Sequence, residues 1–254
     1  MKRNICIFLS VLLSIVFFLP ITTYAQTYNL GGTDMSISLD DTMWYVFTRD
    51  NIKDNAELEE LGITYDAMHD ILYSNEAYID AVLYYEGGEY VEMFVRKRAL
   101  DLGLANLSNY DDSEVLELAE GLAKKQGAEI YSVYENQYKF AKLEYIDANY
   151  GYYICEFVTC VNKDNYTLTF QSNAPFTAEE YAEIEKIVDS VRFEVDTSIK
   201  EKTSSSIAGD VLEKTVGGAV IGGVFGAVIA FANKKKKKTG KTDDAAVADH
   251  TKTD

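Results

Sequence analysis

The sequence predicts an α+β domain on an antiparallel sheet flanked by helices, placed between a signal peptide and one C-terminal transmembrane helix. Two observations predict this fold class. Segments that alternate apolar and polar residues follow one another as consecutive hairpins, as on either side of Glu86-Gly87-Gly88. Segments with helical periodicity stand only at the breaks between hairpins, so the strict strand–helix alternation of a parallel sheet is absent.

The first half of the domain contains two strand pairs separated by helices. Thr64 can cap the second helix, whose buried face we expect to hold Tyr65, Met68, Ile71 and Leu72. Alternation in the fourth strand places Val91, Met93 and Val95 on one face and Glu92 on the other. We expect strands at 35–39, 43–47, 77–85 and 89–98, and helices at 57–61 and 64–73.

The second half is a meander of strands with one helix before it and one after it. Asp112 or Ser113 can cap the first helix, and Thr177 opens the second with a capping box to Glu180. We expect the first helix to bury Val115, Leu116, Ala119, Leu122 and Ala123, and the second to bury Tyr181, Ile184, Ile187 and Val188. The strands are expected at 129–135, 138–146, 152–162, 166–172 and 191–195, and the first helix at 112–126.

The N-terminus has the pattern of a secretory signal peptide. Lys2 and Arg3 precede an apolar stretch at 5–19, and Ala25 ends a small-residue cleavage pattern. We therefore predict a signal peptide over 1–25 and an extracytoplasmic domain over 27–195. Residues 196–215 are rich in Ser, Thr and Lys and are predicted to form a flexible linker.

An apolar run over 216–232 is followed by a dense basic cluster. The run has no charged residue, and its 17 residues are just enough to cross a thin bilayer as a helix. Lysines on one side predict a single-pass membrane protein with a cytoplasmic tail over 233–254. The alternatives are a buried helix of a soluble domain and a cell-wall sorting signal, whose motif is matched here only at Leu212 and Thr215. The stop-transfer residues are Lys234, Lys235, Lys236, Lys237 and Lys238.

Small residues recur every four positions along the predicted membrane helix, at Gly218, Gly222, Gly226 and Ala230. Such a stripe lets two helices approach closely, so it predicts a possible homodimer contact in the membrane. Glycine is also common in spanning helices without any role in association, which is the alternative.

The charge of the outer segment is strongly negative. Residues 26–215 contain 37 acidic and 15 basic side chains, a net charge of −22. Such a surface repels nucleic acid and anionic lipid, so we expect no nucleic-acid partner. It could attract cations or basic partners, or serve solubility alone.

The side chains that most enzymes use are scarce. His69 is the only histidine of the outer domain and lies outside any nucleophile motif or zinc-ligand spacing. Cys155 and Cys160 are expected on opposite faces of one strand, too far apart for a disulfide. We therefore expect no cofactor, no metal site and no catalytic residue.

Paired carboxylates are the one feature that could serve catalysis. They occur at Asp40-Asp41, Asp111-Asp112 and Glu179-Glu180. The first two pairs fit turns, and the third fits a helix N-terminus, where acids stabilise the helix dipole. The alternatives are weak binding of a divalent cation and a cell-surface hydrolase that acts on wall polymers.

Tyrosine is enriched, with 19 in 254 residues. A rigid, amphipathic side chain suits a recognition face for proteins or sugars, but it also suits packing within strands. Tyrosines expected in strands are Tyr84, Tyr85, Tyr90, Tyr131, Tyr134, Tyr138, Tyr152 and Tyr153.

The order of elements supports a resemblance to a known family. A strand pair with Trp44, the meander over 152–172, Pro175-Phe176-Thr177 and the closing segment 181–193 resemble the PsbP-like superfamily, an α/β/α sandwich. The likeness spans about 28–195. The resemblance implies a binding or assembly module without a shared catalytic motif. The combined prediction is a membrane-anchored extracytoplasmic module that binds an unknown protein or surface polymer, with the hydrolase as the alternative.

Overall fold

The computed structural model describes residues 25–99 and 106–196. Almost all of the expected signal peptide and linker lie outside these ranges, as do the expected membrane helix, its small-residue stripe and the lysine cluster. Within the described ranges, no helix combines the length and the hydrophobicity that crossing a membrane requires.

Two antiparallel sheets form the domain, which confirms the α+β class with an antiparallel sheet. The small sheet has the order β1-β2-β10 and the large sheet has the order β3-β4-β5-β9-β8-β7-β6. The small sheet consists of β1 (Gln26–Asn29), β2 (Met35–Leu39) and β10 (Arg192–Phe193). The large sheet consists of β3 (Tyr45–Thr48), β4 (Ala77–Tyr84), β5 (Tyr90–Ala99), β6 (Ile130–Glu135), β7 (Lys139–Ile146), β8 (Tyr153–Val161) and β9 (Asp164–Ser172).

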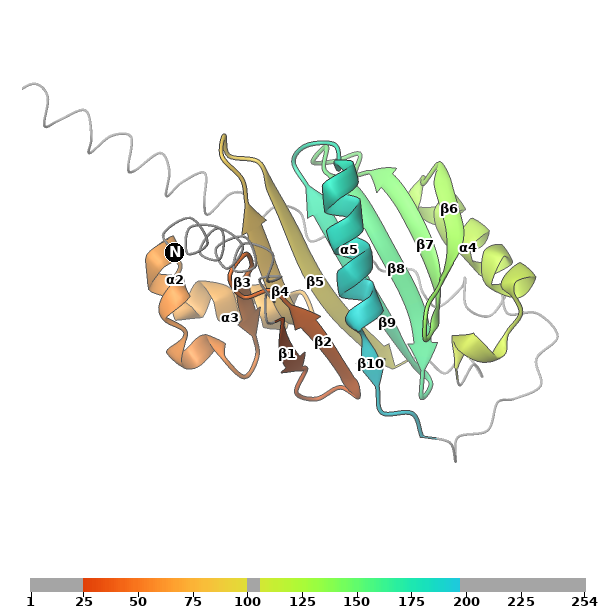
Figure 1. The fold of residues 1–254 in the computed structure, drawn as a ribbon, viewed down its shortest axis with the longest axis horizontal. Helices are drawn as coiled ribbons and strands as arrows, with labels where there is room; N and C mark the ends of the chain where they lie inside the picture. Colours follow the sequence, from red (N-terminus) through yellow and green to blue (C-terminus); the bar gives the residue numbers. More distant parts are fainter. Residues whose placement is uncertain (1–24, 100–105, 197–254) are drawn as a thin grey trace, which may run out of the picture.

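Helices cover both faces of the large sheet (Figure 1). One face packs against the small sheet and α5, while α3 and α4 cover opposite ends of the other face. The helices are α2 (Ala56–Leu61), α3 (Tyr65–Ser74), α4 (Asp112–Gln126) and α5 (Ala178–Ser190), with short 3-10 turns η1 (Ile52–Asp54) and η2 (Leu107–Asn109).

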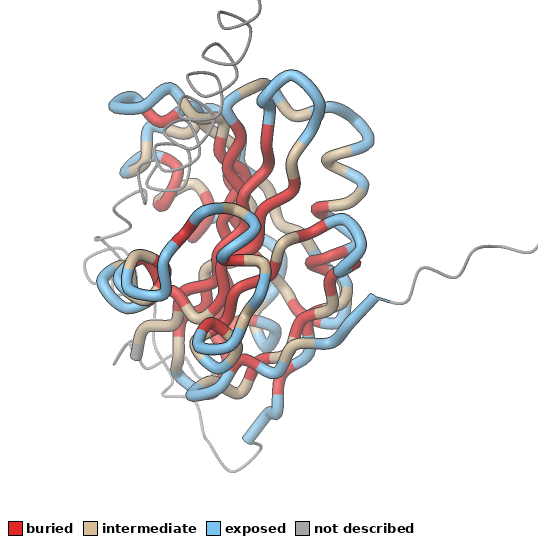
Figure 2. Tube along the Cα trace, turned by 90° about the vertical axis from the view of Figure 1, so that its left-hand side faces the viewer, coloured by how far each residue is buried: buried red, intermediate tan, exposed pale blue. Residues whose placement is uncertain are grey.

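The core lies along the centres of the strands, and the loops are exposed (Figure 2). Val91, Met93 and Val95 pack against the small sheet and α5, as their alternation predicts. Cys155 and Cys160 are buried and belong to different core clusters on opposite faces, which confirms their predicted separation.

Several predicted helix ends are confirmed. Thr64 caps α3, and Thr177 forms the capping box that opens α5. Gly62 and Gly127 end α2 and α4 in the left-handed conformation that glycine adopts at little cost.

Three predicted details are wrong, and one strand was not predicted. The cap of α4 is Asp111, not Asp112 or Ser113, because the Asp111 carboxylate accepts from the Glu114 N–H. Tyr65 and Leu116 are exposed, because the neighbouring strands contact the adjoining stripes of α3 and α4, and Leu118 takes the core position in α4. β1 was not expected, because its mostly exposed residues lack strand alternation.

Candidate functional site

One member of each carboxylate pair singled out from the sequence stabilises local structure. Asp40 Oδ1 accepts hydrogen bonds from the Thr42 N–H and hydroxyl, at 3.1 and 2.6 Å. Asp111 and Glu180 belong to the capping boxes of α4 and α5. The Asp40-Asp41 and Glu179-Glu180 pairs lie in a turn and at a helix start, as expected, whereas the Asp111-Asp112 pair was expected in a turn and instead opens α4.

His69 lies in the middle of α3, where its ring stacks on that of Tyr73 with 4.2 Å between centroids. Its side chain remains partly exposed. Within 25–99 and 106–196, no three His, Cys, Asp or Glu side chains are grouped so that they could hold a metal ion.

Several tyrosines gather at one end of the large sheet, where its strands begin or end. This tyrosine end comprises the starts of β3, β5, β6 and β8 and the ends of β4, β7 and β9, as their antiparallel pairing requires. A continuous row of rings crosses it, with successive centroids 6.0 to 6.4 Å apart. In order, the row is Tyr45, Tyr84, Tyr90, Tyr152 and Tyr150.

The tyrosine end also carries most of the exposed apolar side chains. Six of the ten large hydrophobic residues that are exposed in the described ranges lie there, and Tyr150, at 61%, is the most exposed of them. The tyrosine count hinted at this surface, but Met43, Ile130 and Ile146 gave no signal because their neighbourhood depends on strand pairing. The six are Met43, Tyr85, Ile130, Tyr131, Ile146 and Tyr150.

The strand ends and loops of the tyrosine end are acidic, and one of their carboxylates, Glu144, forms an ion pair with Lys142 of β7 at 3.0 Å. Residues 40–45, 84–90, 129–131, 144–153 and 172–181 contain no lysine or arginine. Their acidic residues are Asp40, Asp41, Glu86, Glu89, Glu129, Glu144, Asp147, Glu179 and Glu180. Basic side chains such as Arg98, Lys139 and Lys163 lie instead at the other end of the strands.

A pocket of about 390 Å³ opens at the β3 edge of the tyrosine end, and we call it the Trp44 pocket. Trp44, Tyr45 and Tyr84 supply aromatic walls, while Asp41 and Glu57 supply carboxylates. Trp44 Nε1 and the Tyr84 hydroxyl are both buried, and neither has a hydrogen-bond partner in the described part of the chain.

Two buried carboxyl groups, those of Asp80 and Glu92, lie on the same face of the sheet as Tyr84. Burial, reinforced by the neighbouring Glu92, raises the pKa of Asp80 well above its usual range. Burial likewise raises the pKa of Glu92 to about 7, against the opposing effect of a hydrogen bond from Gln171. Both carboxyl groups raise the pKa of the Tyr84 hydroxyl further, beyond the larger effect of its own burial.

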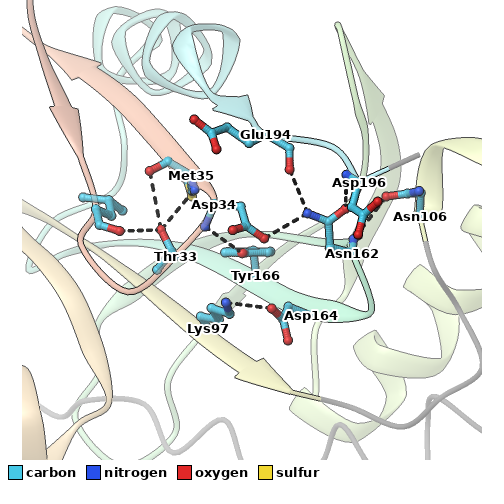
Figure 3. Close-up of polar contacts among 11 residues, drawn as sticks. Thr33, Asp34, Met35, Lys97, Asn106, Asn162, Asp164, Tyr166, Glu194 and Asp196 are labelled. Atoms are coloured by element: carbon cyan, nitrogen blue, oxygen red, sulfur yellow. Dashed lines mark hydrogen bonds and ion pairs between the residues drawn. The ribbon is translucent and has the colours of Figure 1, made fainter. Parts of the chain in front are cut away.

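A second hollow, of about 510 Å³, lies at the opposite end of the sheet and is also acidic. Its polar groups are largely satisfied by one another (Figure 3). Asn162 Nδ2 donates to Asp34 Oδ2 at 2.9 Å and to the Glu194 carbonyl at 2.7 Å, and Asn162 Oδ1 accepts from the Asp196 N–H at 2.8 Å. Lys97 Nζ lies 2.7 Å from Asp164 Oδ2. These hydrogen bonds join the β8–β9 turn to the chain just before β2 and just after β10. The hollow therefore fits a structural role.

No family model matches the sequence, and no curated protein is similar to it at a significant level.

Proposed function

We propose that this protein is a membrane-anchored extracytoplasmic binding or assembly module whose recognition surface is the tyrosine end. The anchoring rests on the sequence features at 1–25 and 216–238. The recognition surface rests on the residues that the sheet topology brings together.

The observation that carries the proposal is the concentration of exposed apolar side chains at one end of the sheet. Scattered single apolar residues are normal on a protein surface, whereas a gathered set marks a contact surface. Tyrosine supplies large contact area with little loss of conformational entropy on binding. The surrounding carboxylates favour a partner that is cationic where it makes contact.

The hydrolase alternative requires two carboxyl groups that face one cleft at a defined separation. One member of each pair that suggested it, Asp40, Asp111 or Glu180, is committed to a turn or a helix start, and Asp41 and Glu57 line the Trp44 pocket from two different segments. The exposed apolar side chains of the tyrosine end therefore favour the binding module over the hydrolase.

The proposal is tested by crosslinking and capture from intact cells with the full-length chain as bait. Tyr85→Ser combined with Tyr150→Ser should abolish the crosslinked species, because it removes two of the exposed rings of the tyrosine end. The matched control is Tyr65→Ser combined with Tyr73→Ser, two exposed tyrosines of α3 outside that surface. Equal capture by both double variants would contradict the proposal.

A further inference from the structure

The Trp44 pocket has walls suited to a positively charged group. Three of its side chains are aromatic, and the rings of Tyr45 and Tyr84 meet edge to face with centroids 6.0 Å apart. Aromatic faces carry negative electrostatic potential and attract ammonium groups within about 6 Å of the ring centre, most strongly on tryptophan.

The charged groups of the pocket point to the same class of ligand. Asp41 and Glu57 line it, and among the described residues no basic side chain does. Their negative field extends to the neighbouring Tyr28, whose pKa is raised to about 12 by burial and then by Asp41 and Glu57. Burial also raises the pKa of Glu57, with smaller contributions from Glu60 and Asp41.

The buried polar atoms without a hydrogen-bond partner indicate a second property of the ligand. Trp44 is only 2% exposed, and its indole N–H, which can only donate, lacks an acceptor among the described residues. Buried donors in native proteins are nearly always paired, and an acceptor oxygen of a ligand that reached this N–H from the pocket would pair it. That oxygen should be neutral, because Asp41 and Glu57 repel a carboxylate or phosphate.

We infer that the Trp44 pocket binds an ammonium group carried by a small polar ligand with neutral oxygens beside it, as in an amino sugar. The volume of about 390 Å³ falls at the lower end of the range for small-molecule sites, about 300–1,000 Å³. The inference rests on the proposed function, because the pocket forms part of the tyrosine end and would supply its chemical specificity.

Trp44 is the only tryptophan of the chain, so its fluorescence reports directly on the pocket. The test titrates the full-length protein in detergent with glucosamine, N-acetylglucosamine and glucose at neutral pH, followed by fluorescence and by calorimetry. Glucosamine should bind and change the Trp44 emission. The other two sugars, which share its ring but lack the ammonium group, should not bind.

Glu57→Gln should weaken glucosamine binding about tenfold, as expected for the loss of a charge-assisted hydrogen bond. Glu59→Gln, an exposed position on the same helix that does not line the pocket, should leave binding unchanged. Equal binding of N-acetylglucosamine, or equal weakening by both variants, would overturn the inference, as would the absence of binding by calorimetry.

The two proposals can fail separately. If glucosamine does not bind but Tyr85→Ser with Tyr150→Ser still abolishes crosslinking, only the ligand assignment is wrong. If glucosamine binds through Glu57 but the double variant still forms the crosslinked species, the ligand assignment is correct and the tyrosine end is not the contact surface.

Discussion

Glu92 is a carboxylic acid in an environment that disfavours its charged form. It is 3% exposed, near the start of β5, beside Gln171 and near the buried Asp80. A carboxyl group in such a place favours its neutral form, because ionisation there loses the hydration that water would supply. The folded protein therefore binds a proton at Glu92 more readily than the unfolded chain does.

This difference predicts a pH-dependent stability. The folded pKa of Glu92 is about 7 and lies above the unfolded value, about 4.3. The stability that the folded protein gains from binding a proton at Glu92 is fully present below the unfolded pKa. It is lost as the pH rises through the folded pKa of about 7. Glu92→Gln should remove this loss and raise the free energy of unfolding, relative to wild type, by up to about 3 kcal/mol at about pH 8.

Urea unfolding of the full-length protein in detergent at about pH 4 and about pH 8 measures this effect. The advantage of Glu92→Gln should disappear at the lower pH, where Glu92 is protonated in both states. Glu89→Gln in the exposed β4–β5 turn is the control and should change neither value. The same increment for Glu92→Gln at both pH values would show that Glu92 is not the titrating group.

At the scale of elements, the β8–β9 turn is the most constrained connection. Asn162 and Lys163 both have positive φ, 54° and 69°, as a two-residue hairpin turn of this type requires. Asparagine tolerates this conformation, and here its side chain also joins β8 to residues before β2 and after β10.

Asn162→Gly should separate these two roles. Glycine keeps the turn conformation without strain but removes the three side-chain hydrogen bonds, so we expect a loss of about 1–2 kcal/mol in unfolding free energy. Lys163→Gly is the matched control in the same turn and should be neutral or slightly stabilising, because it relieves a left-handed lysine. Equal stability of Asn162→Gly and wild type in urea unfolding would show that the side-chain bonds contribute nothing.

Local signals predicted the elements well where local physics decides them. The caps at Thr64 and Thr177 and the glycines that end α2 and α4 follow from unpaired backbone groups within one helix turn. The prediction of the buried face of α4 was partly wrong. Leu116 and Leu118 are both apolar, and only the contact of α4 with β6 and β7 determines which of them is buried.

At the scale of the whole molecule, the basic side chains are unevenly distributed between the two ends of the strands. The tyrosine end has no basic residue in its strand ends and loops, whereas Arg98, Lys139 and Lys163 lie at the other end. A cationic ligand or partner approaching the domain is thereby attracted toward the tyrosine end, and salt should weaken that attraction.

The predicted membrane helix offers a test of self-association. Gly222→Leu should lower the dimer signal of residues 216–232 in a membrane reporter assay, because it places a bulky side chain in the small-residue stripe. Ile221→Leu, which keeps side-chain size off the stripe, should leave the signal unchanged. An unaltered signal for Gly222→Leu would remove the homodimer proposal.

The sequence by itself determined the fold class, most strands and helix ends, and the negative charge, because periodicity, caps and composition are local properties of the chain. Only the tertiary structure decided that Trp44, Glu57 and Tyr84 share one pocket and that five tyrosines form one row. The physical reason is that alternation tells which face a side chain takes, whereas strand order and register, set by non-local pairing, determine its neighbours.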